Sequence, residues 1–163
     1  MPYLVDGHNL LWAIHHHDEH FAPVDDRALC RLLARYGRSM HDRVELIYDG
    51  VGPPDKGAFY GHRNLQVSFA GEGSDADTLI EHRVQTCTQP KRLVVVSTDR
   101  RVRTAARRAK ATSVPSVEFW MRVLERLNRK RAAPEPSGKR HGVSKQETRQ
   151  WLKTFGLDNE GKL

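Results

Sequence analysis

Three apolar runs of this chain each end at an aspartate, and segments with helical periodicity separate the runs. Strands are predicted at residues 2–6, 44–48 and 93–98, and the aspartates that close them are Asp6, Asp49 and Asp99. Strands separated by helices form crossover units, and such units build parallel sheets. The pattern therefore predicts an α/β fold with a mainly parallel central sheet flanked by helices.

The remaining segments complete this fold. Helices are predicted at residues 25–40, 75–87 and 100–109 and from Ser116 onward, and a fourth strand at 65–69. The run at 93–98 shows no polar alternation, which is typical of a central strand covered on both faces. The strand at 65–69 alternates apolar and polar residues, so we expect it towards an edge of the sheet.

Histidines and cysteines are interpreted here as structural rather than metal-binding. The histidines at 15–17, with His20, are expected in a solvated loop. On a helix their successive side chains would point about 100° apart and could not converge on one ion. Cys30 and Cys87 fall inside predicted helices without CxxC spacing, so we expect both to be buried as small apolar side chains.

The end of the chain differs in composition from the rest. Residues 131–143 are rich in Pro, Gly and basic side chains, which is typical of a flexible linker. Ser144 and Glu147 then have the spacing of a capping box, and the helix they begin is too short to be stable alone. We predict one domain over residues 1–130, a linker over 131–143 and a short helical appendage over 144–163.

The charge of the chain indicates the class of its partner. The formal net charge is +7 and the pI is about 9.7, which favours a polyanion because Lys and Arg neutralise phosphates and release counterions. No apolar stretch approaches the roughly 20 residues that cross a bilayer, and the first residues lack a signal-peptide pattern. A cytoplasmic protein that does not act at a membrane is therefore expected.

The acidic residues are expected to meet at one edge of the sheet. In an open parallel sheet, functional groups collect beyond the carboxyl ends of the strands, where the three strand-closing aspartates stand; Asp75 and Asp77 belong to a loop that enters a helix. Oxygen ligands suit Mg²⁺ and Mn²⁺, and a divalent ion lets an acidic pocket accept a phosphodiester. We expect the metal ligands Asp6, Asp77 and Asp99, the second-rank members Asp49 and Asp75, and Asn9, whose amide would hold a carboxylate or a water.

Each acid taken singly also has a structural interpretation. Asp6 and Asp49 each precede a glycine, as in ordinary turn dipeptides, and Asp75 and Asp99 can cap helices. Their common position at one end of the predicted sheet favours the metal site over four separate local roles.

The same residues resemble a known family in their order along the chain. Asp6–Asn9 resembles the D-G-x-N opening of NYN-domain nucleases, a branch of the PIN-like superfamily, and Ala76–Glu81 resembles the A-D-x-x-I-E segment of YacP-like ribonucleases. Val94–Asp99 is similar to the family's V-V-(S/T)-x-D strand end, and Ser116–Phe119 to its S-x-x-F helix start. The resemblance covers roughly residues 1–130.

The resemblance implies a three-layer PIN-like fold and a metal-dependent endoribonuclease with Asp6, Asp77 and Asp99 in its centre. Glu81 matches the family's glutamate and lies one helical turn after Asp77, where it either binds metal, orients a ligand or is exposed to solvent. His8 departs from the pattern, because the family more often has Tyr there.

RNA is the expected partner, and whether it is messenger RNA on ribosomes stays open, as does the oligomeric state. The candidate substrate-binding residues are Arg100, Arg101, Arg103, Lys56, His62 and Arg63. The leading hypothesis is hydrolysis of RNA phosphodiesters by a metal-activated water. The alternative is a non-catalytic RNA-binding or ribosome-associated module with the same fold. A phosphatase of the haloacid-dehalogenase class is disfavoured, because His8 stands where that class needs a second aspartate.

Overall fold

The computed structural model describes residues 2–17 and 24–129, with the side chain of Ala58 left out. In this part of the chain five parallel strands form one sheet in the order β3-β2-β1-β4-β5. The strands are β1 (Tyr3–Asp6), β2 (Val44–Tyr48), β3 (Leu65–Phe69), β4 (Val94–Val96) and β5 (Thr112–Val114). The parallel α/β prediction is thereby confirmed.

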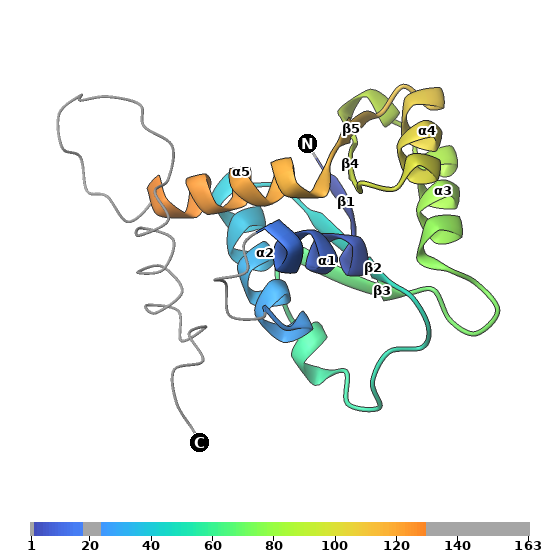
Figure 1. Cartoon of the computed structure of the whole chain (residues 1–163). Helices are drawn as coiled ribbons and strands as arrows, with labels where there is room; N and C mark the ends of the chain where they lie inside the picture. The colour runs from blue at the N-terminus through green and yellow to red at the C-terminus, as the bar shows by residue number, and fades with distance from the viewer. Residues whose placement is uncertain (1, 18–23, 130–163) are drawn as a thin grey trace, which may run out of the picture.

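Helices cover both faces of the sheet and give three layers (Figure 1). They are α1 (Gly7–His17), α2 (Asp26–Met40), α3 (Ala76–Thr86), α4 (Arg100–Arg108) and α5 (Ser116–Arg129), with short 3₁₀ turns η1 (Gly57–Phe59) and η2 (Pro90–Arg92). In Figure 1, α1, α2 and α5 lie on one side of the strands, and α3 and α4 on the other. None of the described helices is long and apolar enough to cross a membrane.

The core is divided into two by the sheet. Val5 and Val96 pack into the cluster beneath α1, α2 and α5, whereas Leu4 and Val95 pack into the cluster beneath α3 and α4. Successive strand side chains point to opposite faces, so a run such as Val94–Val96 must be apolar throughout when helices cover both faces. The predicted central position of this strand is confirmed, as is the edge position of β3.

The strand order sets where a site can form. β1 pairs with β2 on one side and with β4 on the other, so the connections after β1 and β4 leave the sheet towards opposite faces. Such a switch point opens a crevice outside the carboxyl ends of the strands. Asp6 ends β1 at this position, and the segment after β4 faces it across the crevice.

Three details of the fold differ from prediction. Cys87, expected to be buried inside a helix, is a partly exposed residue that follows the last residue of α3, whereas Cys30 is buried as expected. The helix α1 begins at Gly7 directly after Asp6, without a turn, and His15–His17 form its last turn rather than a solvated loop. The strand β5 was not predicted, because its three residues, Thr112–Val114, include only one apolar side chain. The predicted linker and appendage lie outside the described residues, as does His20.

Gly7 is required by a close approach between α1 and β2. A Cβ added there would lie 2.4 Å from the nearest ring atom of Tyr48, and Tyr48 is buried. The missing side chain lets the first turn of α1 lie against β2, which keeps Asp6 and Asn9 at the sheet edge.

Candidate active site

The predicted acidic residues do gather at the carboxyl edge of the sheet. Asp6 is the last residue of β1, and Asp49 follows β2 directly. Asp75 and Asp99 are the N-caps of α3 and α4, and Asp77 lies in the first turn of α3. The sheet and the two helix starts thus bring together residues that are up to 93 positions apart in sequence.

Asp6 is the most buried of these acids, with 5% of its surface exposed. Its Oδ1 accepts a hydrogen bond from the Asn9 backbone N–H at 3.1 Å, and its Oδ2 accepts one from the Ser97 hydroxyl at 3.1 Å. Burial raises the pKa of Asp6, and these two hydrogen bonds offset part of that rise. A buried carboxylate with two fixed oxygens is suited to hold a cation in one position.

Ser97 joins Asp6 to Asp99 and was not predicted as a site residue. Its side chain is fully buried; its hydroxyl donates to Asp6 and accepts from the Asp99 backbone N–H at 3.0 Å. A polar residue at the end of an apolar strand, two positions before an aspartate, was the signal available in the sequence.

Asn9 holds three segments of the site together. Its side-chain oxygen accepts from the Thr98 backbone N–H at 2.8 Å and from the Ser116 hydroxyl at 2.7 Å. Ser116 is buried at the start of α5, so this one amide oxygen connects α1 to the ends of β4 and β5. The side-chain amide of Asn9 was expected to hold a carboxylate or a water, but the Asp6 carboxylate is bound by the Asn9 backbone N–H. The side-chain oxygen instead orders the neighbouring backbone.

Replacing Asn9 by alanine is expected to lower the free energy of unfolding by about 1–3 kcal/mol, because the buried Ser116 hydroxyl and the Thr98 N–H lose their acceptor. Urea denaturation of the purified chain measures this change. Asn64→Ala is the matched control and should cost about 0.5–1.5 kcal/mol, because within residues 2–17 and 24–129 the Asn64 amide makes one hydrogen bond, to the Asp42 carbonyl. An unchanged midpoint for Asn9→Ala would contradict the assigned role.

Asp77 carries the clearest electrostatic sign of a shared site. Burial, and to a smaller extent the carboxylates of Asp99 and Asp6, raise its pKa to about 6. Among the described residues, no hydrogen bond or ion pair to its carboxylate is found. A carboxylate raises the pKa of a second carboxyl group only when the two groups are close together. Asp6, Asp77 and Asp99 therefore interact across the crevice.

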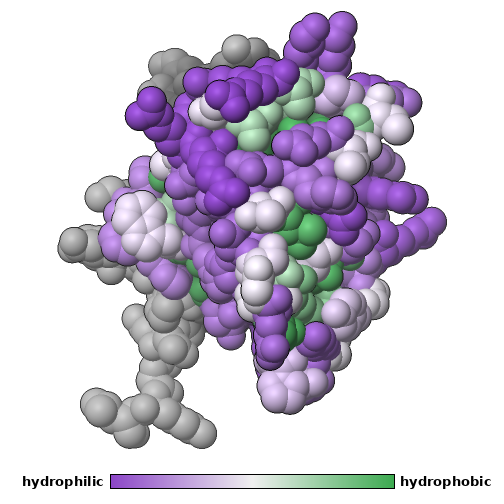
Figure 2. Space-filling model, turned by 90° about the vertical axis from the view of Figure 1, so that its right-hand side faces the viewer, coloured by the Kyte–Doolittle hydropathy of each residue, from purple (hydrophilic) through white to green (hydrophobic). Residues whose placement is uncertain are grey.

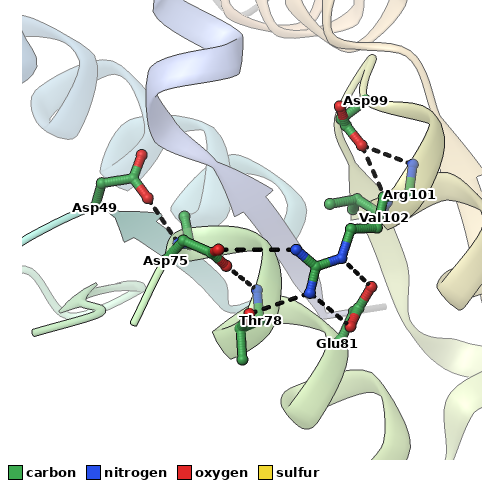
Figure 3. A network of polar contacts seen from close by, with 8 residues as sticks. Asp49, Asp75, Thr78, Glu81, Asp99, Arg101 and Val102 are labelled. Atoms are coloured by element: carbon green, nitrogen blue, oxygen red, sulfur yellow. Dashed lines mark hydrogen bonds and ion pairs between the residues drawn. The ribbon is translucent and has the colours of Figure 1, made fainter. Parts of the chain in front are cut away.

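Asp49 and Asp75 are tied into the fold by hydrogen bonds (Figure 3). Asp49 accepts from the Ala76 backbone N–H at 2.7 Å, which lowers its pKa, and His8 Nδ1 lies 3.1 Å from its other oxygen. Asp75 accepts from the Thr78 N–H at 2.6 Å as the cap of α3, and its pKa is lowered too. Asp99 similarly caps α4 through one oxygen, at 2.6 Å from the Arg101 N–H. The cap interpretation of Asp75 and Asp99 is therefore confirmed, and it leaves their second oxygens for other contacts.

Arg101 points into the acidic group rather than away from it (Figure 3). Its guanidinium donates to both oxygens of Glu81, at 2.8 and 3.1 Å, and to the Thr78 hydroxyl at 3.1 Å. The Asp75 carboxylate lies 3.7 Å from it. Arg101 thus neutralises the negative charges of Glu81 and Asp75 on α3, and it binds Glu81 through a bidentate contact.

The other candidate RNA-binding residues are not brought to one place. Arg100 lines a groove of about 830 Å³ between α3 and α4, with Arg108 on the same wall and Asp99 at its border. Arg103 is half-buried, and the structure gives its Nε no hydrogen-bond partner. Lys56 lies over the ring of Phe69, 5.3 Å from its centroid.

His62 and Arg63 lie away from the acids. Both precede β3, at the amino edge of the parallel sheet, and Arg63 lines a separate groove there with Pro2 and Arg43. The expectation that these two residues reach the same rim as the acids gains no support from this position.

The donor set suits a hard divalent cation. As arranged here, no three or more His, Cys, Asp or Glu side chains of residues 2–17 and 24–129 form a group that could hold a metal ion. Asp6, Asp77 and Asp99 nevertheless offer only carboxylate oxygens, which match the preference of Mg²⁺ and Mn²⁺, and Mg²⁺ keeps several waters between itself and its ligands.

Comparison with known proteins identifies the family. The model of the YacP-like NYN domain matches residues 3–156, and thus extends past residue 130. The crystal structure of Rae1 (YacP) from Bacillus subtilis is similar, with a TM-score of 0.63 and 18% identity over 96% of this chain and 84% of that chain. The structure of its W164L mutant gives a TM-score of 0.62 and 21% identity over 96% and 86%. No curated protein matches. This chain therefore belongs to the YacP-like NYN family, a family generally of nucleases with a PIN-like fold.

Proposed function

We propose that this protein is a metal-dependent endoribonuclease whose centre is formed by Asp6, Asp77 and Asp99. The observation that supports it most is the position of the three carboxylates at one edge of the sheet, where Asp6 ends β1, Asp77 lies in the first turn of α3 and Asp99 caps α4. Burial and the two other carboxylates raise the pKa of Asp77 there. The mutual repulsion of these acids lowers the stability of the fold, and Arg101 offsets only part of it at Asp77. A bound cation would offset that loss, and a cation there would serve phosphodiester hydrolysis.

The three acids would hold one or two Mg²⁺ or Mn²⁺ ions through the oxygens that the fold leaves available. When bound, the metal supplies activation of a water and neutralisation of charge on the phosphodiester. Ser97 and the Asn9 backbone keep Asp6 oriented. Arg101 keeps the Glu81 carboxylate occupied, so Glu81 would act by positioning α3 rather than as a first ligand.

RNA would approach along the groove between α3 and α4. Arg100, Thr104 and Arg108 line this groove, and their spacing of four places them along one side of α4, over roughly 12 Å at 1.5 Å per residue. Figure 2 shows that the face carrying α3 and α4 is mostly hydrophilic. Basic side chains next to Asp99 would hold phosphates beside the acids. The net charge of +7 and the nuclease family support the same substrate class.

Cleavage of a single-stranded RNA oligomer is expected only when Mg²⁺ or Mn²⁺ is present. A chelator should stop the reaction, and excess metal should restore it, because the acids alone repel the phosphodiester. Gel electrophoresis of an end-labelled oligomer measures this and shows whether cuts are internal.

Two outcomes would contradict the proposal. Undiminished cleavage in chelator would remove the metal from the reaction. Salt-sensitive RNA binding that survives chelation, without cleavage at any metal concentration, would instead support the non-catalytic RNA-binding module.

A further inference from the structure

One side of α1 carries a row of exposed aromatic rings that begins at the active site. The row consists of His8, Trp12 and His16, which are spaced four residues apart and therefore share one face of the helix. The His8 side chain is 54% exposed, Trp12 is 58% exposed, and His16 is also exposed. The row starts one position after the Asp6–Gly7 junction between β1 and α1.

Contacts within the row hold the rings in place. The rings of Trp12 and His16 are stacked, with centroids 4.2 Å apart and planes 23° apart. His16 Nδ1 donates to the Trp12 carbonyl at 2.8 Å, which fixes the imidazole over the indole. At the other end, His8 lies 3.1 Å from the Asp49 carboxylate and edge-on to Tyr48. The surface is thus ordered before any ligand binds.

The fold itself does not require this row. The opposite face of α1 supplies the core through Leu10, Ala13 and Ile14, all almost fully buried. A single exposed apolar side chain needs no explanation, but a contiguous row of exposed aromatic rings beside a site is typical of a surface that contacts a ligand.

We propose that Trp12 and His16, with His8 at the site end, form a stacking surface for unpaired RNA bases. This rests on the proposed function, since the row continues from the acidic crevice. Every base has a π-face, and aromatic platforms bind single strands by stacking on it with little sequence preference. The phosphates of the same strand would face Arg100 and Arg108 on the α4 side of the crevice. Bases and backbone are thereby bound on opposite sides of the acids.

Binding of single-stranded RNA by the full chain tests the proposal. It is measured with Ca²⁺ in place of Mg²⁺ or Mn²⁺, so that a cation offsets the charge of the acids, and gel electrophoresis of the recovered probe checks that it stays uncut. The probe is an end-labelled RNA of about ten nucleotides, followed by fluorescence anisotropy. Trp12→Ala should weaken binding by about 5- to 150-fold, the equivalent of one lost stacked base, whereas Trp12→Phe should retain most of the affinity. His16→Ala should weaken binding more than His17→Ala, its matched control, because His17 is an exposed neighbour outside the stack.

A second probe separates base stacking from phosphate binding. An oligomer of the same length without bases keeps the phosphates, so wild type and Trp12→Ala should bind it equally. Quenching of tryptophan fluorescence by the intact oligomer should shrink in Trp12→Phe when both proteins also carry Trp151→Phe, because the remaining tryptophan, Trp120, is buried.

The outcomes also separate this proposal from the proposed enzyme. Equal binding of the intact oligomer by wild type and Trp12→Ala would overturn it, as would an equal loss on the oligomer without bases, or no binding by wild type. Trp12-dependent binding in a protein that never cleaves RNA would support the stacking surface and contradict the proposed endoribonuclease activity.

Discussion

The Asp77→Asn protein is expected to cleave RNA at least about 100-fold more slowly than wild type, while its metal-free form unfolds less readily. The side chain keeps its size but loses the charge that would hold the cation. A bound metal lowers the activation free energy of such reactions by several kcal/mol, and each loss of about 1.4 kcal/mol slows the reaction tenfold. Stability should rise because Asp77 no longer opposes Asp6 and Asp99. Cleavage rates at saturating Mn²⁺ and thermal unfolding in chelator measure the two effects.

Asp75→Asn is the matched control for this experiment. Asp75 lies two positions earlier, and its carboxylate caps α3, a role that asparagine fills equally well. Activity should therefore fall much less than in Asp77→Asn. Asp6→Asn and Asp99→Asn should both abolish cleavage with little loss of fold, and full activity in both would refute the assignment of the metal ligands.

The stability of the metal-free protein is expected to fall as the pH rises from about 4 to about 6. Asp77 binds its proton more tightly in the folded protein, with a pKa of about 6, than in the unfolded chain, with a value near 3.8. Between these values the folded state holds more protons, so raising the pH favours unfolding, and the loss is complete above the folded pKa. Solvent screening of this half-exposed group reduces the expected change to roughly 1–2 kcal/mol.

The neighbouring acids divide into two groups by the sign of this effect. The pKa of Asp6 is raised by burial, so it acts in the same direction as Asp77. Asp49 and Asp75 have lowered pKa values because backbone N–H groups donate to them. The stability that Asp49 and Asp75 contribute is fully present above the pKa that they have in the unfolded chain. It is lost as the pH falls from that value through their lower folded pKa, so this loss occurs at lower pH than the effect of Asp77.

A divalent cation should reverse the loss above pH 6. A ligand that binds only the folded state stabilises it by about 2.7 kcal/mol at a hundred times its Kd. Urea denaturation from pH 4 to 7, with and without Mn²⁺, measures both changes, and Asp77→Asn should show a flatter pH profile and a smaller response to Mn²⁺. Identical profiles for wild type and Asp77→Asn would contradict the shared acidic centre.

The order of the elements was predictable because hydrophobic pattern and local caps decide it. The apolar run of β4 is typical of a strand covered on both faces. Asp75 and Asp99 predicted the starts of two helices, and the structure confirms both. β5 could not be predicted, since it is a strand only through its parallel pairing with β4. The histidines of α1 were misplaced for a related reason: helix α1 is stabilised by packing of Leu10 and Ile14 in the core, and this contact outweighs the weak helical preference of a polar tail.

At the site, positions were predictable but partners were not. Aspartates that close strands of a parallel sheet must lie at one edge, so local sequence was enough to bring Asp6 and Asp99 together. The contacts of Ser97 with Asp6 and of Asn9 with Ser116 join residues 91 and 107 positions apart. Arg101 similarly reaches Glu81 across two helices. No local pattern encodes such pairs.

Along this chain, periodicity and capping residues were sufficient for the fold class, the parallel sheet and the edge at which the acids gather, because these depend on neighbours in sequence and on the hydrophobic effect. The three-dimensional fold alone decided which oxygens stay available, which arginine serves as an internal counter-charge, and which aromatic rings remain exposed beside the crevice. Those outcomes depend on burial and on distances between side chains, and both are set only when the layers have packed.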